Sequence, residues 1–323
     1  MFDRDRSEQR ARRTGRLSRA FAVFIAISLV ASVALLLGVI LTRDAHVPDE
    51  RGAAGSTASA TIGFFDVGQG LSVGVVTGDG ASMLYDFGNS RADAEEIIIP
   101  FFREHDIDAI DYAVLSHPHQ DHLGGLPAFL EVMPVNRFLD PVIETTNQTY
   151  FQSLEMIDER GIPASAARQG DTYALGDHAT FEILWPTDEL LTERDGEHRI
   201  NDNSSVIRLD IGDLAVLLTG DIEEDAEAEL IQTFDDGLDV DVLQVSHHGS
   251  DTSTSTDWLS HTTPETGIIS SGLDNQYGHP HDEPLQRLRE HEVQIYRTDI
   301  DGTVILRTRG DSYDITTERT DTS

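Results

Sequence analysis

The sequence predicts an α/β (α+β) fold of αββα architecture, in which two mixed β-sheets face each other and helices cover their outer surfaces, preceded by one N-terminal transmembrane helix. Two observations predict this arrangement. An uninterrupted apolar segment lies near the N-terminus, and after it short apolar runs of strand type alternate with helical patterns in two successive halves. With 323 residues and 39% hydrophobic content, the chain can form one core of about 200–250 residues beside smaller appendages.

The apolar segment at residues 20–41 is bounded by Arg19 and Arg43. At about 1.5 Å per residue it is long enough to cross a hydrocarbon core of about 30 Å. Seven Arg precede the segment, so residues 1–19 are predicted to stay in the cytoplasm and the rest of the chain to lie outside a cell membrane that it crosses once. A cleaved signal peptide, with small residues for the cleavage site at 58–60, is the alternative, although the apolar region of such peptides usually has only about 7–15 residues.

One domain is predicted at residues 61–311, between a flexible linker at 42–60 and a polar, Thr- and Asp-rich tail at 312–323. Apolar runs of strand length, bounded by turn residues, predict strands at 61–65, 71–77, 82–86, 112–116, 181–185, 205–211, 214–219, 242–246, 266–270, 294–296 and 303–307. Apolar residues spaced three and four positions apart predict helices at 92–104, 123–132, 150–160, 223–234, 256–260 and 283–290.

The composition is strongly acidic and lacks two residue types. The chain has no Cys, which excludes disulfides, thiolate metal ligands and a cysteine nucleophile. All 23 basic residues are Arg, against 58 Asp and Glu, and residues 44–323 alone carry 15 Arg and 55 acidic residues. The acidic residues are spread over the whole domain, which argues against an acidic tail. This pattern predicts a halophilic protein, because molar salt reduces the Debye length to about 3 Å and screens the self-repulsion.

Four potential metal ligands occur within six residues: His117, His119, Asp121 and His122. The short apolar run before them predicts that the two first histidines leave the end of a buried strand, and that Asp121 and His122 lie at the start of the next helix. A single zinc ion needs three or four ligands, whereas these four groups extend in two directions. They suit two divalent ions about 3.5–4 Å apart that share a bridging hydroxide.

Two more sets of polar residues follow apolar strands. Asp221 comes directly after Gly220 at a strand end, which exposes its carboxylate at the rim of a sheet. It could bridge metals there, or it could cap the acidic helix that follows. His247 and His248 also follow a buried strand and must point in different directions, so that one can bind a metal while the other reaches the substrate.

Three further residues are candidates for supporting roles. Asp66 and Asp86 each follow an apolar run and have a Gly two positions later, so each could orient a metal-binding histidine from behind or fix a turn. His279, within Tyr-Gly-His-Pro, lies on a loop that could lean over the metals and donate a proton to a leaving group or bind phosphate. A structural turn is the alternative for His279.

The motif His117-x-His119-x-Asp121-His122 resembles the signature of the metallo-β-lactamase superfamily of hydrolases. The similarity extends from Ile62 to Arg309 and is strongest to the soluble hydrolase domain of the ComEC competence proteins. Six more motifs agree with that branch in order and spacing, at residues 64–70, 86–88, 201–204, 217–221, 246–250 and 277–280. One departure is that the first motif of this branch usually continues Gly-Gln-Gly-Asp-Ser, whereas this chain has Leu71 in place of that Asp.

The resemblance implies roles for the site residues. It implies that His117 and His119 bind the first metal, that Asp121 and His122 bind the second, and that Asp221 bridges both. Either histidine of the pair His247 and His248 could complete the second metal site, and we favour His248. His247 is then the group that faces the substrate.

Where most of the superfamily supplies a third histidine to the first metal, this chain has Asn201-Asp202-Asn203-Ser204, as ComEC relatives do. The site is therefore expected to hold Zn²⁺ less tightly or to prefer Mn²⁺. Asn203, Asp121, His247 and His279 are the candidate catalytic residues, and Asn201 is a candidate for supporting the ligands.

Two metals and an activated water favour phosphodiester hydrolysis. The resemblance implies a nuclease acting on DNA, in connection with DNA uptake. The acidic surplus and the lack of a basic stripe oppose binding of a polyanion, although molar salt weakens that repulsion. The alternatives are a hydrolase of a small phosphodiester, a lactone or another ester, and a non-catalytic partner of a separate DNA-uptake channel.

Overall fold

The computed structural model describes residues 58–193, 199–309 and 312–319. The predicted transmembrane helix at 20–41 and nearly all of the predicted linker lie outside these residues. In the part of the chain that is described, no helix combines the length and the apolar character needed to span a membrane.

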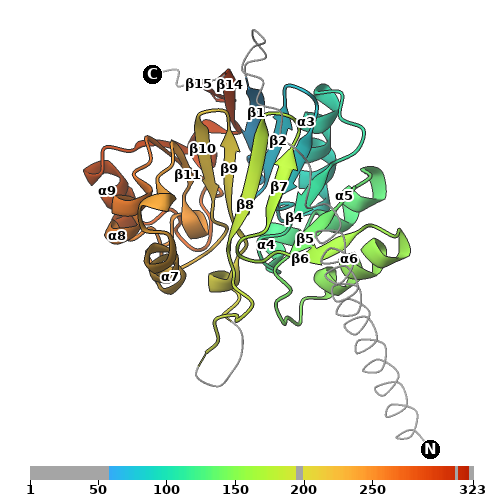
Figure 1. Cartoon of the computed structure of the whole chain (residues 1–323), viewed down its shortest axis with the longest axis horizontal. Coiled ribbons are helices and arrows are strands. Elements are labelled where there is room, and N and C mark those ends of the chain that lie inside the picture. Colours follow the sequence, from blue (N-terminus) through green and yellow to red (C-terminus); the bar gives the residue numbers. More distant parts are fainter. Residues whose placement is uncertain (1–57, 194–198, 310–311, 320–323) are drawn as a thin grey trace, which may run out of the picture.

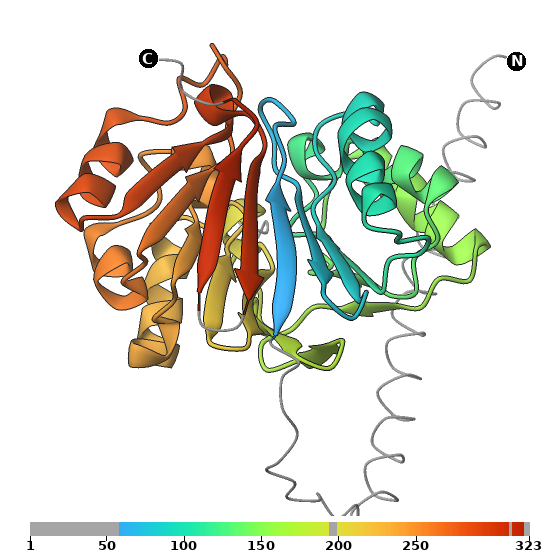
Figure 2. The ribbon, with the colours of Figure 1, turned by 90° about the horizontal axis from the view of Figure 1, so that it is seen from above.

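The described residues form the predicted αββα sandwich (Figures 1 and 2). The eight-stranded sheet has the order β15 (Tyr313–Thr317), β14 (Val304–Arg309), β1 (Ser59–Phe64), β2 (Val73–Thr77), β3 (Ser82–Tyr85), β4 (Tyr112–Val114), β5 (Phe138–Asp140) and β6 (Ala164–Ala166). The seven-stranded sheet has the order β13 (Gln294–Arg297), β12 (Thr266–Ile269), β11 (Val242–Gln244), β10 (Leu214–Leu218), β9 (Val206–Ile211), β8 (Ala179–Trp185) and β7 (Thr172–Leu175).

Helices cover the outer face of each sheet, as Figure 2 shows from above. Those of the first half are α2 (Arg91–Asp93), the π-helical turn η1 (Ala94–Ile98), α3 (Ile99–Glu104), α4 (Gln120–Leu123), α5 (Leu126–Val132) and α6 (Gln148–Glu159). Those of the second half are α7 (Glu224–Phe234), α8 (Thr256–Thr262), α9 (Asp282–Glu290) and α10 (Thr298–Asp301), with the 3₁₀ turns η2 (Asn201–Asn203), η3 (Asp235–Leu238) and η4 (Ser246–Gly249).

The core lies in three layers because side chains of successive strand residues point to opposite faces of a sheet. On β10, Val216 and Leu218 belong to the cluster between the two sheets, whereas Leu217 packs under the helices of the second half. On β2, Val75 points between the sheets and Val76 packs beneath the helices of the first half. Both sheets are therefore buried on both faces over their central strands, which fixes the positions of the strand ends.

The predicted motifs meet at one edge of the sandwich. Strands β3 to β6 run parallel, as do β10 to β13, so their carboxyl ends lie together. The histidine motif follows β4, Asp221 follows β10, and the histidine pair follows β11. In open α/β sheets this edge is where ligands bind.

The structure differs from the sequence-based expectation in several elements. Strands β5, β6 and β7 were not predicted; the first two have only three residues each, and in β7 exposed residues alternate with less exposed ones. The predicted helix at 123–132 is divided into α4 and α5. The predicted polar tail is corrected as well, because Tyr313–Thr317 forms the edge strand β15 paired with β14.

Gly124 and Gly125, which separate α4 from α5, are required by close packing. A Cβ atom at Gly124 would lie 1.9 Å from the carbonyl oxygen of Asn89, and one at Gly125 would lie 2.3 Å from that of Phe87. Both clashes are with backbone, which cannot move aside as a flexible side chain can. The two glycines therefore let the chain after the histidine motif pack directly on the loop after β3.

Glu227 on α7 is fully buried and holds the loop that follows the histidine pair. Its carboxylate accepts the backbone N–H groups of Thr254 and Ser255. Burial raises the pKa of Glu227 from its usual value of 4.5 to about 7, although these two N–H donors favour the charged form. Because the pKa is raised on folding, the associated stability is fully present below about pH 4.5 and is lost as the pH rises through about 7.

We predict that Glu227→Gln removes this component of the pH dependence. The stability difference between wild type and variant should shrink by roughly 3 kcal/mol between pH 4.5 and pH 8, since one pKa unit corresponds to about 1.4 kcal/mol. At low pH the variant should be the less stable protein, because one backbone N–H loses its acceptor. Urea unfolding across this pH range measures the difference, with the exposed Glu229→Gln as the control, and a constant difference would contradict the prediction.

Candidate metal centre

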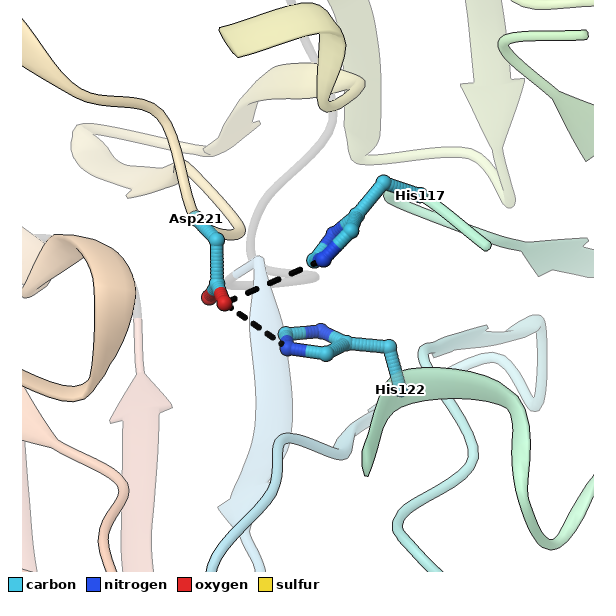
Figure 3. Close-up of side chains that lie close together, drawn as sticks. All are labelled: His117, His122 and Asp221. Atoms are coloured by element: carbon cyan, nitrogen blue, oxygen red, sulfur yellow. Dashed lines mark hydrogen bonds and ion pairs between the residues drawn. The ribbon is translucent and has the colours of Figure 1, made fainter. Parts of the chain in front are cut away.

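The carboxylate of Asp221 is the central group of the site. Its Oδ2 atom lies 3.1 Å from Nε2 of His122 and 3.8 Å from Nε2 of His117 (Figure 3). It is also 3.4 Å from Nε2 of His248 and 3.9 Å from Nε2 of His247. Four imidazoles from the loops of both sheets therefore converge on one oxygen atom that is nearly inaccessible to solvent.

Gly220 allows Asp221 to reach this position. Gly220 has φ +55°, and a Cβ atom there would lie 2.8 Å from Cβ of Ser116. The chain after β10 thus packs against the start of the histidine motif, and the backbone N–H of Asp221 donates to Oγ of Ser204 at 3.2 Å. The alternative in which Asp221 caps α7 is not observed, because the residue before α7 is Glu223. The first turn of α7 is instead capped by Asp202, whose Oδ1 accepts the backbone N–H groups of Glu223 at 3.0 Å and Ala226 at 3.4 Å.

His117 and His119 form one half of the site. Nε2 of His117 lies 2.9 Å from Nδ1 of His119, so these two atoms face a common point. Two ligands of a tetrahedral zinc with Zn–N bonds of about 2.0–2.1 Å lie about 3.3 Å apart, which is close to this spacing. On its other side, Nδ1 of His117 lies 3.0 Å from Oγ of Ser116 and 3.2 Å from Oγ of Ser204.

Asp121, His122 and His248 form the other half. Nε2 of His248 lies 3.4 Å from Oδ2 of Asp121, while its Nδ1 donates to the backbone carbonyl of Ser270 at 2.8 Å. That hydrogen bond leaves Nε2 free to act as a ligand. His247 and His248 both have positive φ, at 50° and 57°, and with this uncommon backbone both neighbouring rings present Nε2 toward Asp221, contrary to the expectation that they point in different directions.

The electrostatics of the site favour a cation. Burial opposes charge on His122, but Asp221, Asp86 and Asp121 together raise its pKa well above the usual value. Burial would likewise raise the pKa of Asp121, yet His122 and His248 lower it. Three carboxylates around one imidazole are thus stabilised by positive charge, which a bound divalent ion supplies more fully than a proton.

The side-chain nitrogen and oxygen atoms of the site are arranged as ligands of a divalent metal ion. Oδ1 of Asp221 and Nε2 of His248 are buried and have no hydrogen-bond partner in the part of the chain that is described. Two triads hold their ligand atoms within 4.8 Å of one another, namely His117, His122 and Asp221, and Asp121, His122 and His248. Five of the six predicted ligands thus lie in these triads. The sixth, His119, lies beside His117, with 2.9 Å between Nδ1 of His119 and Nε2 of His117. The division of the six ligands between two ions remains a prediction.

Asp86 orients His122 from behind. Its Oδ2 accepts from Nδ1 of His122 at 2.7 Å and from Oγ of Ser116 at 2.6 Å, and its Oδ1 accepts from the Ser116 backbone N–H at 2.7 Å. Asp86 is fully buried with φ +60°. A carboxylate bonded to the rear nitrogen fixes which imidazole nitrogen faces a metal.

Two predicted site residues have other roles. Asp66 was expected to orient a ligand, but its carboxylate accepts from the Gly68 backbone N–H and pairs with Arg319. Asn203 was expected to be catalytic, but its side-chain amide bonds the backbone of Leu191 and Arg199 at every polar atom. Asp66 therefore fixes a turn and Asn203 fixes a loop, because the polar atoms of their side chains are engaged by these other partners.

Asn201 does lie at the site, together with a residue that the sequence did not single out. Nδ2 of Asn201 lies 3.4 Å from Nε2 of His247, and its Oδ1 is buried without a hydrogen-bond partner among the described residues. Glu223 was not predicted, yet its Oε1 lies 3.3 Å from Nδ1 of His247 and accepts from Asn201 at 3.3 Å. In the sequence, Glu223 is one of several acidic residues at the start of a predicted helix. The only signal that could have identified it as a site residue is its position two residues after Asp221.

His279 lies at the mouth of the site. Its ring is 5.7 Å from that of His247 and 6.2 Å from that of His248, measured between centroids. Partial burial, followed by the neighbouring His248 and His247, lowers the pKa of His279 to about 4. Its Nδ1 is buried and unpaired in the described part of the molecule.

Leu71, which stands where the ComEC branch usually has Asp, leaves no gap beside the metal ligands. Leu71 is fully buried in the cluster between the sheets, and its backbone N–H donates to the carbonyl of Asp121 at 3.1 Å. The neighbouring Gly70 is required by close packing, because a Cβ atom there would lie 2.5 Å from the same carbonyl oxygen. The first motif therefore supports the backbone of Asp121 rather than supplying a ligand.

An αββα sandwich with a His- and Asp-rich metal centre at the carboxyl edge of both sheets defines a class of metal-dependent hydrolases. The family model described as the metallo-β-lactamase superfamily matches residues 66–272. This chain belongs to that superfamily.

Among curated proteins, the chain is similar to competence and recombination proteins. It is 32% identical over 213 residues to ComE operon protein 3 of Bacillus subtilis, covering 66% of this chain and 26% of that protein. It is 34% identical over 258 residues to Recombination protein 2 of Haemophilus influenzae, covering 79% of this chain and 30% of that protein. A more distant similarity, 25% over 233 residues, is to the endoribonuclease YSH1 of Yarrowia lipolytica, covering 67% of this chain and 27% of that protein. The chain thus spans about a quarter to a third of the length of these relatives.

We predict that Asp86→Asn weakens metal binding by about 10–100-fold, because the amide can present N–H to the rear of His122 and no longer fixes its orientation. Asn tolerates the positive φ at this position, so the backbone should be retained. Isothermal titration of the metal-free protein with Zn²⁺ or Mn²⁺ measures the effect. Asp66→Asn is the matched control, and equal weakening by both variants would contradict the assignment.

Proposed function

We propose that the domain is a dinuclear metal-dependent phosphodiesterase that acts on DNA. The observation that carries the proposal is the convergence of four imidazoles on Oδ2 of Asp221, with Asp121 beside them. A buried shared carboxylate flanked by two sets of ligands is the arrangement that two adjacent divalent ions require. The names of the competence, recombination and endoribonuclease relatives support a nucleic acid as the substrate.

Two ions, Zn²⁺ or Mn²⁺, would be held by His117, His119, Asp121, His122, Asp221 and His248 and would supply an activated water and neutralise phosphoryl charge. The remaining work falls to residues of this chain. Burial lowers the pKa of His247, but Asp221 and Glu223 raise it overall, so that the ring can carry hydrogen on both nitrogens. Nδ1 then faces Glu223, and Nε2 can donate a hydrogen bond to a phosphoryl oxygen. His279 is neutral at pH 7 because its pKa is lowered to about 4, so it can accept or relay a proton on the leaving-group side. Asn201 offers an amide oxygen that has no partner among the described residues, in place of a third histidine.

A smaller substrate is the second candidate, and the charge of the chain favours it. The formal net charge is −35, and Arg199 and Arg287 beside the site are already bound by carboxylates or backbone carbonyls. A phosphate backbone therefore gains little long-range attraction here. Small phosphodiesters, lactones and other esters do not depend on such attraction.

Hydrolysis assays decide between these candidates. The full-length chain in detergent and molar KCl should hydrolyse single-stranded DNA in the presence of Mn²⁺ or Zn²⁺, and His119→Ala should lower the rate by more than about 100-fold. His178→Ala, at an exposed residue, is the matched control. Cleavage of methyl p-nitrophenyl phosphate alone would establish the smaller substrate, and no turnover would favour another ester or a non-catalytic partner of a DNA-uptake channel.

We further propose that residues 20–41 anchor the chain in the cell membrane with the domain outside. The length of the apolar segment and the seven Arg before it support this orientation. Protease added to intact cells should then digest the domain, as detected with an antibody against it. Protection in intact cells with digestion after lysis would contradict the orientation.

A further inference from the structure

The loop from β12 to α9 exposes large apolar side chains beside the metal centre. Four such side chains are exposed in the described residues, namely Val132, Leu273, Tyr277 and Ile300. Leu273 is 72% exposed and Tyr277 is 55% exposed, and both belong to the loop that carries His279. Single exposed hydrophobic residues are ordinary on protein surfaces, whereas two in one short loop at a reaction site indicate contact with a ligand.

The ring of Tyr277 continues a row of rings that starts inside the site. The centroids of Tyr277 and His279 are 5.6 Å apart with an interplanar angle of 24°. Those of His279 and His248 are 6.2 Å apart, again at 24°. Nε2 of His248 in turn lies 3.4 Å from the carboxylates of Asp121 and Asp221. A planar group stacked on Tyr277 would thus lie two rings away from the metal ligands.

The loop is held in this conformation by its own hydrogen bonds. Oδ1 of Asn275 accepts the backbone N–H groups of Tyr277 at 3.1 Å and His279 at 3.0 Å. Nε2 of His281 donates to the carbonyl of Tyr277 at 3.1 Å, while its Nδ1 accepts the backbone N–H of Asp251 at 3.0 Å. Tyr277 is therefore positioned before a substrate arrives, so that stacking on it costs little ordering entropy.

Stacking also provides affinity that does not depend on positive charge. A base stacked on an aromatic side chain contributes about 1–3 kcal/mol whatever its sequence, and this contribution requires no basic groove. In a chain of net charge −35, such contacts must replace much of the attraction that basic residues give other nucleases. The faces of bases are covered in a duplex and accessible in a single strand, so a stacking residue selects the single strand.

We propose that Tyr277 is a specificity-determining residue that stacks on a nucleobase next to the scissile phosphate, and that the substrate class is accordingly single-stranded nucleic acid. This inference rests on the proposed phosphodiesterase function. Tyr277 contributes to substrate binding and not to the chemical step. Its ring stacks on His279, which lies next to the predicted metal ligand His248.

The test compares a single-stranded oligothymidylate with methyl p-nitrophenyl phosphate on the full-length protein with Mn²⁺. Tyr277→Ala should raise KM for the oligonucleotide about 5- to 150-fold, which is the stacking contribution converted at 1.36 kcal/mol per factor of ten. The increase in KM for methyl p-nitrophenyl phosphate should be at least about fivefold smaller than the increase for the oligonucleotide. Tyr277→Phe should keep the wild-type KM because its ring still stacks, and Ile300→Ala, at an exposed residue elsewhere, is the matched control.

The outcomes separate the two proposals. Wild-type cleavage of the oligonucleotide with an unchanged KM in Tyr277→Ala, or an equal loss in Tyr277→Phe, would overturn the stacking role and leave the phosphodiesterase function intact. If the wild type cleaves neither diester, the proposed function fails, and fluorescence anisotropy with labelled oligothymidylate decides the inference by itself. Binding that is at least about fivefold weaker in Tyr277→Ala supports stacking there, and equal binding overturns it.

Discussion

The architecture of this protein depends on a buried excess of carboxylate. Asp86, Asp121 and Asp221 lie around His122 where the two sheets meet, and two of the three are almost completely shielded from water. Charge of one sign at such a place is costly unless a counter-charge is close. The imidazoles provide part of that counter-charge when protonated, and a divalent ion provides more. The negative charge of the site is therefore fully balanced only when a cation binds there.

This requirement accounts for the irregular backbone around the site. Asp86, Gly220, His247 and His248 all have positive φ, and each lies just after the end of a parallel strand. Regular strands would carry these side chains away from one another, because successive residues point to opposite faces. Left-handed residues turn them back toward a common point. The regular sheets supply rigid strand ends, and the strained residues set the directions of the ligands.

Much of the site could be predicted from the sequence because its ligands are adjacent in the chain or follow apolar strands. The histidine motif and Asp221 belong to this group. The predictions for Asp66 and Asn203 were wrong because the direction of each side chain depends on the local turn, which the sequence pattern does not reveal. Asn201 and Asn203 lie in one 3₁₀ turn, yet their side chains leave it on different sides, so that only Asn201 meets His247. The same limit applies to the short strands β5 and β6, whose pairing depends on long-range packing rather than on their own three residues.

The acidic composition of the chain and the candidate metal centre have opposite effects on the phosphate substrate that we propose. At long range the net charge of −35 repels a polyanion, and at high salt that repulsion falls off within a few Å. At short range the proposed dinuclear centre would attract phosphoryl oxygens, and its field would be little screened because most of its ligands are buried. Such a balance makes the substrate contact local, through the metals and a few neighbouring side chains. The proposed phosphodiesterase function therefore does not require Arg199 or Arg287, which are already bound by a carboxylate and a backbone carbonyl.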